Sequence, residues 1–245
     1  MMASAKPIGI NMMSNFWPAI VLRFVPLFFI IAVCIGIAFY PGGNIHNPEQ
    51  AGYSLTHNFL SDLGGYQSHS NEVNFISGFF FNMAMFLFAA VGIAFLFVAR
   101  LFREDSLNTS LATVGSIFFL VGTIFFAAVG LTPYDLYLDL HVFFAVNAFR
   151  LMVPGSALYL IVLLRSEVGN RYALFTAIYL VCVFAYVIYQ LVSGNALENP
   201  EEMIRQASIQ KLIVLVTVLT VFSLSFAFER QLDILQTSTL NTAPN

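Results

Sequence analysis

The sequence predicts an all-α integral membrane protein, a single bundle of six transmembrane helices. Of its 245 residues 59% are hydrophobic, 9% are charged and 27 are Phe, a composition that excludes a water-soluble domain. A helix needs about 20 apolar residues, each rising 1.5 Å, to cross about 30 Å of hydrocarbon. Six stretches meet this requirement: residues 17–40, 73–99, 111–131, 138–164, 172–193 and 208–228.

The segments between these stretches are short and polar, so we expect one six-span transmembrane domain over residues 1–245. The first stretch is expected to be a true span and not a cleaved signal peptide. Its apolar run is too long, Pro26 interrupts it, and no small-residue cleavage site precedes Tyr40.

The distribution of Lys and Arg predicts that both termini are cytoplasmic. In that orientation seven of the ten basic residues lie at the inner face, and only Arg205 and Lys211 lie at the outer face. All four histidines and eight of the thirteen carboxylates then lie outside. We therefore expect a multi-pass protein of the cell inner (plasma) membrane. Its outer face has no basic patch, so nucleic acid is not an expected partner.

The longest connection, residues 41–72, carries the segment THNFLSDLGG at Thr56–Gly65. Its pattern predicts a short amphipathic helix that Ser54 caps and that Gly64 ends in the left-handed conformation. The apolar side of this helix is expected to rest on the outer ends of the spans, with its polar side facing a pocket.

Spacings of four residues inside this predicted helix pair its polar side chains. They place His57 over Ser61, and Asn58 over Asp62. In the simplest interpretation these pairs only steady the loop.

The fourth span is expected to begin with a cap formed by Thr132, Pro133 and Asp135. At 100° per residue, one stripe of about 120° contains Asp135, Asp139, Phe143, Asn147, Arg150 and Pro154. A polar stripe on a lipid-bathed helix is expected to point into the bundle.

Arg150 is the most informative residue of this stripe, because an arginine near mid-membrane costs about 2.5–3.5 kcal/mol. Its side chain leans toward the helix N-terminus and so toward Asp139. Pro154 cannot donate to the carbonyl of residue 150, which leaves that acceptor free. Two interpretations remain open: Arg150 ties helices together through carbonyls and Asn147, or it binds a ligand.

Two other spans also carry polar stripes. The fifth has Tyr179, Cys182, Tyr186, Tyr189 or Gln190, and Ser193, and the second has Asn71, Asn74, Gly78 and Asn82. Helix packing and interfacial anchoring are the simpler explanation, and the small residues of the third span, Gly115, Ser116, Gly122 and Thr123, are expected to serve packing. The functional interpretation is a polar pocket in the outer half of the bundle whose ligand-binding residues are Arg150, Asn147, Asp139, Tyr186, Tyr189, Gln190 and Asn74.

Two motifs, HNFLSDLG at His57–Gly64 and GLTPYDLYLDLH at Gly130–His141, carry a family resemblance. The chain resembles a family of bacterial and archaeal six-span membrane proteins known only as a domain of unknown function. That family is similar in layout to the FRAG/DRAM/SFK-type proteins, which act in lipid and membrane regulation. The resemblance implies the six-span fold but no reaction, and the positions that match its motifs are Ser61, Asp62, Gly64, Asp135 and His141.

A second set of residues is similar in kind to the sites of transmembrane hydrolases of the alkaline ceramidase and adiponectin-receptor type. This resemblance implies a zinc cofactor held by His57, His141 and Asp139, with Ser61 and Asp62 as catalytic residues. The chain departs from that pattern. It has six spans instead of seven and no HxxxH pair in its last span, and on an ideal helix His141 points about 160° away from Asp139.

The function expected from the sequence is the binding or sensing of a membrane lipid or other amphiphile in an outer-leaflet polar pocket. Its head group would contact Arg150, Asn147 and the loop helix, and its tail would lie between Phe-rich spans. This interpretation needs no cofactor. The alternative is a metal-dependent intramembrane hydrolase that acts on a lipid amide or ester and uses zinc.

Overall fold

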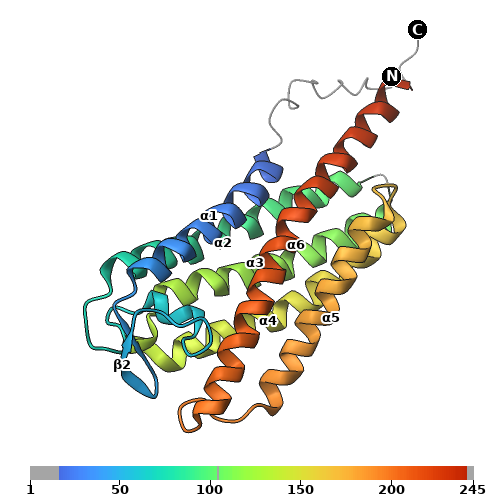
Figure 1. Ribbon diagram of the computed structural model, residues 1–245. Helices are drawn as coiled ribbons and strands as arrows, with labels where there is room; N and C mark the ends of the chain where they lie inside the picture. Colours follow the sequence, from blue (N-terminus) through green and yellow to red (C-terminus); the bar gives the residue numbers. More distant parts are fainter. Residues whose placement is uncertain (1–16, 104, 242–245) are drawn as a thin grey trace.

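A computed structural model describes residues 17–103 and 105–241 of the chain. Its long helices are α1 (Trp17–Phe39), α2 (Phe75–Val98), α3 (Ser106–Leu131), α4 (Tyr134–Arg165), α5 (Asn170–Val192) and α6 (Pro200–Asn241), and the 3-10 helix η3 (Ala99–Phe102) continues α2 (Figure 1). Six helices in this described part are long and apolar enough to cross a membrane. The predicted all-α bundle of six spans is therefore confirmed.

Two helices start well before the predicted apolar stretch because polar side chains cap them. The Asp105 carboxylate accepts hydrogen bonds from the backbone N–H groups of Leu107, at 2.8 Å, and Asn108, at 3.2 Å, so α3 begins at Ser106. The Asn199 side chain accepts from the N–H of Glu201 at 2.9 Å at the start of α6. Capped polar turns thus extend these helices beyond their apolar stretch.

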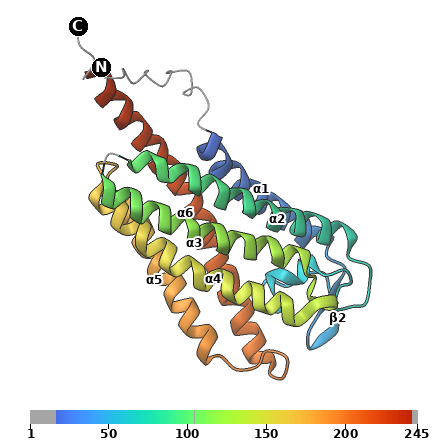
Figure 2. The ribbon, with the colours of Figure 1, turned by 180° about the vertical axis from the view of Figure 1, so that it is seen from behind.

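The six helices form a closed ring in sequence order. Each helix packs against its neighbours along the chain, and α6 returns to pack on α1 (Figures 1 and 2). Arg23 of α1 closes the ring by donating to Glu229 of α6, with 2.6 Å between Nη2 and Oε2. The start of α1 and the end of α6 lie at one end of the bundle, and the long loop covers the other, which we call the loop end.

Small residues let α3 lie close to its neighbours, as the sequence predicts. A Cβ atom on Gly92 of α2 would lie 2.1 Å from the Thr123 Oγ1 of α3, and one on Gly115 would lie 3.0 Å from the Tyr159 ring of α4. Backbones that approach this closely gain van der Waals contact along their length. The α2–α3–α4 side is therefore the tightly packed wall of the ring.

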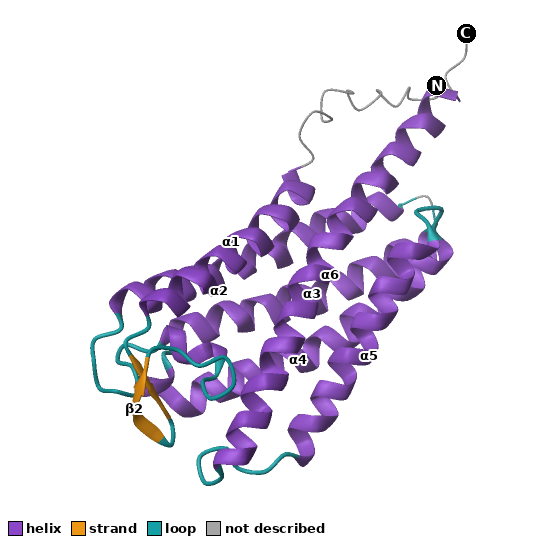
Figure 3. Ribbon diagram, viewed as in Figure 1, coloured by secondary structure: helices purple, strands orange, loops and turns teal. Residues whose placement is uncertain are grey.

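The long loop folds differently from the prediction. It contains an antiparallel hairpin of β1 (Gly42–Asn44) and β2 (Asn47–Ala51), and the 3-10 helix η2 (Leu60–Gly64) (Figure 3). The predicted amphipathic helix from Ser54 is wrong, because residues 55–57 form a turn and only the five residues of η2 are helical.

The predicted left-handed conformation of Gly64 is also wrong, because the φ angle of Gly64 is not positive. Gly64 serves instead as a point of close approach. A Cβ atom there would lie 2.6 Å from the Asn82 Oδ1 and 2.7 Å from the Phe81 ring. Any larger residue would push η2 away from α2.

Candidate functional site

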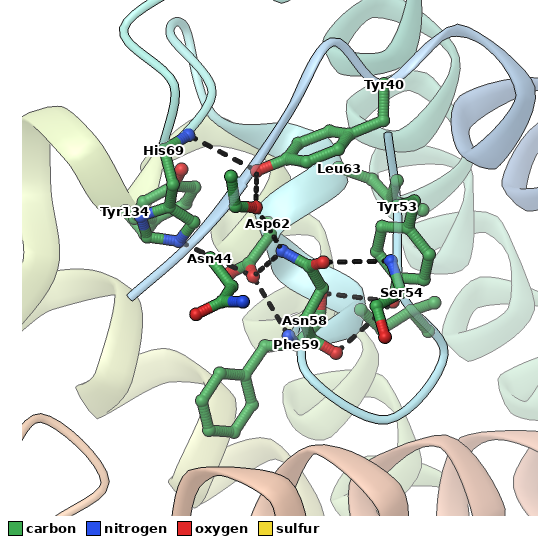
Figure 4. Close-up of polar contacts among 12 residues, drawn as sticks. Tyr40, Asn44, Tyr53, Ser54, Asn58, Phe59, Asp62, Leu63, His69 and Tyr134 are labelled. Atoms are coloured by element: carbon green, nitrogen blue, oxygen red, sulfur yellow. Dashed lines mark hydrogen bonds and ion pairs between the residues drawn. The ribbon is translucent and has the colours of Figure 1, made fainter. Parts of the chain in front are cut away.

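The candidate site is built from a loop that forms a roof over the ring of helices. We call residues 40–70 the roof. At its centre Asn58 and Asp62 are almost completely buried, with exposed fractions of 0% and 3%. The Asp62 Oδ2 accepts hydrogen bonds from the Phe59 backbone N–H at 2.9 Å and the Asn58 side chain at 3.0 Å (Figure 4). The predicted pairing of Asn58 with Asp62 is confirmed.

Asn58 also links the β1–β2 hairpin to the segment just before η2. Its amide group donates to the Gly43 carbonyl at 2.8 Å, and its Oδ1 accepts from the Ser54 N–H at 2.9 Å and from Gln50 at 2.7 Å. Since a buried amide that makes all these bonds cannot be replaced by an apolar group without loss, Asn58 fixes the hairpin against η2.

Tyrosines and a histidine surround the Asp62 carboxylate. The Nε2 of His69 lies 3.5 Å from the Asp62 Oδ2, and the Tyr40 hydroxyl accepts from the His69 N–H at 3.3 Å (Figure 4). Burial, reinforced by the negative charge of Asp62, raises the pKa of Tyr40 and of Tyr53 well above the usual range. Both hydroxyls therefore stay protonated.

The roof is fastened to the bundle on three sides. On α6, the Gln210 Oε1 accepts from the Leu60 N–H at 2.7 Å, and the Lys211 ammonium donates to the Asn58 carbonyl. On α2, Asn74 and Ser77 each donate to the Leu63 carbonyl at 3.0 Å.

On α4, Asp135 accepts from the backbone N–H groups of Tyr66, at 3.0 Å, and Gln67, at 2.9 Å. The predicted cap of α4 is therefore wrong: Asp135 binds the roof, and the Thr132 hydroxyl donates back to Ala128 at 2.8 Å. The chain needs these contacts because a loop with buried polar groups is stable only when they are paired.

Beneath the roof, the centre of the ring holds a cavity of about 50 Å³. Five phenylalanines make up most of its aromatic wall, and its polar positions are Ser61, His141, Gln210 and Thr217. The full lining is Phe29, Leu60, Ser61, Phe81, Met85, Phe88, Phe126, Val129, His141, Ala145, Phe149, Gln210, Val214, Thr217 and Val218.

A second cavity, of about 20 Å³, lies further toward the other end of the bundle. The two cavities share Phe88, Phe126 and Thr217 in their walls. We call the two cavities together the column. Its imidazole and amide groups, His141 and Gln210, are in the first cavity, and the second cavity reaches down to Leu224.

The structure separates most of the predicted site residues from this cavity. Arg150 and Asp139 are exposed on the outer side of α4, and Phe143 between them is 51% exposed. The prediction that this stripe points into the bundle is wrong. The small and aromatic side of α4, with Ala148, Phe149, Met152, Ser156 and Tyr159, packs inward instead.

Arg150 donates to the Asn147 Oδ1 at 3.3 Å. Both residues are on α4, so this bond does not tie two helices together as one of the two interpretations expected. The expected reach to Asp139 is not found, because the ion pairs among the described residues include none between these two side chains.

Three of the other expected ligand-binding residues, Tyr186, Tyr189 and Asn74, have partners within the protein. The Tyr186 ring packs on Phe149 with 4.9 Å between centroids, and the Tyr189 hydroxyl donates to Glu202 at 2.9 Å. Asn74 fastens the roof. Gln190 is half-buried, and its Oε1 has no hydrogen-bond partner among the described residues.

The residues expected to hold zinc also lie apart. His57 is exposed at the surface of the roof, where its Nδ1 lies 2.8 Å from the Thr56 hydroxyl, and the predicted contact with Ser61 is not among the hydrogen bonds of the described residues. His141 is 6% exposed and lines the cavity, whereas Asp139 is on the opposite side of α4, as the predicted angle requires. Within the described ranges, no group of three or more His, Cys, Asp or Glu is placed to hold a metal ion.

The two predicted catalytic residues are separated as well. Ser61 lines the cavity, but Asp62 does not. Sequence reasoning missed Gln210 and Thr217, both on α6. The signal that could have found them is the polar pair Gln210–Lys211 at the start of an otherwise apolar stretch.

Comparison with known proteins places this architecture in a family. No curated protein and no solved structure matches the chain. The comparisons therefore lend no support to the similarity with FRAG/DRAM/SFK-type proteins or with alkaline ceramidase and adiponectin-receptor-type hydrolases. Residues 25–227 match a family model described as "Protein of unknown function (DUF998)", and because this match covers most of the six-helix ring, the chain belongs to that family.

Proposed function

We propose that this protein binds a membrane lipid or other amphiphile inside the ring of helices, with the polar end under the roof and the apolar chain along the column below. The observation that carries the proposal is the cavity itself, which is walled by phenylalanines and has Ser61, His141 and Gln210 on its roof side. Pockets that bind small molecules have this combination of an apolar wall and a few placed polar groups.

The polarity gradient of the column supports an amphiphile over a wholly polar ligand. Ser61, His141 and Gln210 lie in the cavity next to the roof. The walls of the second cavity are Phe, Val, Leu and Met, with three threonines and one tyrosine whose hydroxyls are hydrogen-bonded within the protein. An apolar chain that enters this lower part removes its surface from water or lipid headgroups and fills space that would otherwise lack packing partners.

The roof supports specific binding because it is a fixed structure. It is held to the bundle by a hydrogen bond that Asn74 donates and by hydrogen bonds that Asp135 of α4 and Gln210 of α6 accept. A preformed cover reduces the ordering cost of binding. Hydrolysis receives less support, because the Asp62 carboxylate is engaged by the Phe59 and Asn58 donors and does not line the cavity.

We place the protein in the plasma membrane with the roof on the outer face. The support for this orientation is the excess of Lys and Arg at the end of the bundle opposite to the roof.

The proposal is tested by filling the cavity. Ala145 and Val214 line it, so Ala145→Phe and Val214→Phe should each place a ring in the ligand's space. Val181→Phe is the matched control, because Val181 is 68% exposed on α5. The measurement is quantitative mass spectrometry of the lipids that remain with each purified, monodisperse protein.

We expect wild type and Val181→Phe to retain the same lipid in stoichiometric amount, and both cavity variants to lose it at least about tenfold, because one aromatic ring cannot be accommodated together with a bound chain. Equal retention by the cavity variants and the control would contradict the proposal, provided that circular dichroism shows all four proteins to be folded.

A further inference from the structure

We infer that the ligand is a single-chain lipid whose polar end is an uncharged hydroxyl group, a long-chain alcohol in chemical class. This inference rests on the proposed function and adds the chemistry of the head group. It is carried by three features of the cavity: the charges of its lining, the protonation of His141 and the free hydrogen-bonding groups of Gln210 and Ser61.

The first feature is that no Asp, Glu, Lys or Arg lines either cavity in the described part of the chain. Lys211 and Asp62 are sequence neighbours of lining residues, but both are turned into the roof. Lys211 donates to the carbonyls of Asn58 and Ala207, and Asp62 accepts from Phe59. A phosphate or carboxylate in the cavity would therefore be buried without a counter-charge, which is strongly unfavourable.

The second feature is the protonation of His141. Its Nδ1 lies 2.7 Å from the backbone carbonyl oxygen of Thr132, and a carbonyl oxygen can only accept a hydrogen bond. The proton of the neutral ring is thus on Nδ1, and Nε2 is left as an acceptor on a side chain that lines the cavity. A ligand hydroxyl can donate to this nitrogen, whereas an ether or an ester has no proton to donate.

The third feature supplies donors for the same hydroxyl. The Gln210 Oε1 already accepts from the Leu60 N–H at 2.7 Å, so the cavity-lining amide offers its NH₂ group. Ser61 adds a hydroxyl, which can donate or accept. An alcohol both donates and accepts, so it matches this set of one acceptor and two donors.

The column below the roof restricts the number of apolar chains that the ligand can have. The two cavities meet at Phe88, Phe126 and Thr217, which stand in the walls of both. Movement of these shared side chains would join the two cavities into a passage for one apolar chain, and we therefore infer a single chain and not the two chains of a phospholipid.

The test compares the binding of lipids that have the same hexadecyl chain and differ only in the head group. The full-length protein in nanodiscs is incubated with tritiated hexadecanol, and binding is measured by scintillation proximity against protein-free nanodiscs. Unlabelled hexadecanol, hexadecyl methyl ether and hexadecyl phosphate serve as competitors. The variants are His141→Phe and Ser61→Ala, with His57→Phe as the control because His57 is exposed and outside the cavity.

We expect hexadecanol to compete about tenfold better than its methyl ether, the effect of one buried hydrogen bond, and the phosphate to compete no better than the ether. His141→Phe should remove the preference for alcohol over ether, and His57→Phe should keep it. If His141→Phe does not fold, Ser61→Ala should still reduce the preference.

Two outcomes would overturn the inference. The first leaves the proposed function standing, and the second removes it as well. Equal or tighter competition by the phosphate would show a charged ligand in the cavity and would leave the proposed function standing. No saturable binding of any of these lipids, together with unchanged lipid retention in Ala145→Phe, would remove both.

Discussion

Replacing Asp62 with Asn should open the roof while leaving the six helices intact. The Asp62 Oδ2 accepts two hydrogen bonds, from the Phe59 N–H at 2.9 Å and the Asn58 amide at 3.0 Å, and the carboxylate is buried. An asparagine can turn its carbonyl oxygen toward both donors but loses the charge that strengthens the two bonds. Loss of a charge-assisted bond costs about 1.5–3 kcal/mol, so we expect the roof to be less stable by about 2 kcal/mol.

A change of about 2 kcal/mol raises the open population of the roof about thirtyfold. Native-state proteolysis measures this population, because cleavage within a closed loop proceeds through its open form. We therefore expect cleavage between residues 41 and 72 to accelerate about thirtyfold in Asp62→Asn. Asp139→Asn is the matched control, since Asp139 is exposed on α4, and its cleavage rate should equal that of wild type. Equal rates for the two variants would refute the role of Asp62 in holding the roof.

Three further predictions concern charged residues and topology. The N–H of Asn108, and then Arg165, lower the pKa of Asp105 in the folded protein, so its contribution to stability is present above the unfolded pKa of about 4 and is lost as the pH falls below it. In Asp105→Asn the melting temperature should fall less steeply with decreasing pH below about pH 4 than in wild type. The same steepness in both proteins would exclude a contribution from Asp105. Arg150→Met should leave lipid retention within about twofold of wild type, because Arg150 is outside the cavity and its hydrogen bond is to the neutral Asn147 on the same helix. A larger loss of lipid would show that Arg150 contributes to binding. In a variant with Cys34 and Cys182 replaced by Ser, His57→Cys should react with an impermeant maleimide in intact cells and Arg103→Cys should not, and the reverse pattern would invert the proposed orientation.

The sequence was sufficient to predict the six helices because their signal is local. A stretch of about 20 apolar residues must cross a membrane as a helix whatever surrounds it. The predicted ends were less accurate where polar caps such as Asp105 and Asn199 extend a helix beyond its apolar stretch. The pairing of Asn58 with Asp62 was predictable for the same reason, since the two residues are only four positions apart.

The roof could not be predicted because its structure depends on distant residues. Leu60 and Asn58 are held by Gln210 and Lys211, about 150 residues further along the chain. These contacts replace the helical hydrogen bonds that the amphipathic pattern from Ser54 favours.

The inward side of α4 was misassigned for a different physical reason. Polarity alone suggested that Arg150 faces the interior, but close packing decides which side of a helix meets its neighbour. The small residues Gly122 and Gly155 bring α3 and α4 together, and this contact turns Ala148 and Met152 inward and Arg150 outward.

The most direct test of the central claim, that a lipid chain occupies the ring, is photo-crosslinking with a long-chain alcohol that carries a diazirine along its chain. Labelled peptides are identified by mass spectrometry after crosslinking in nanodiscs. We expect labels on cavity residues of three helices, at Met85, Ala145 and Val214, that disappear with excess unlabelled alcohol. Labels confined to exposed side chains such as Val181 and Val192, and unaffected by competitor, would contradict the proposed binding site.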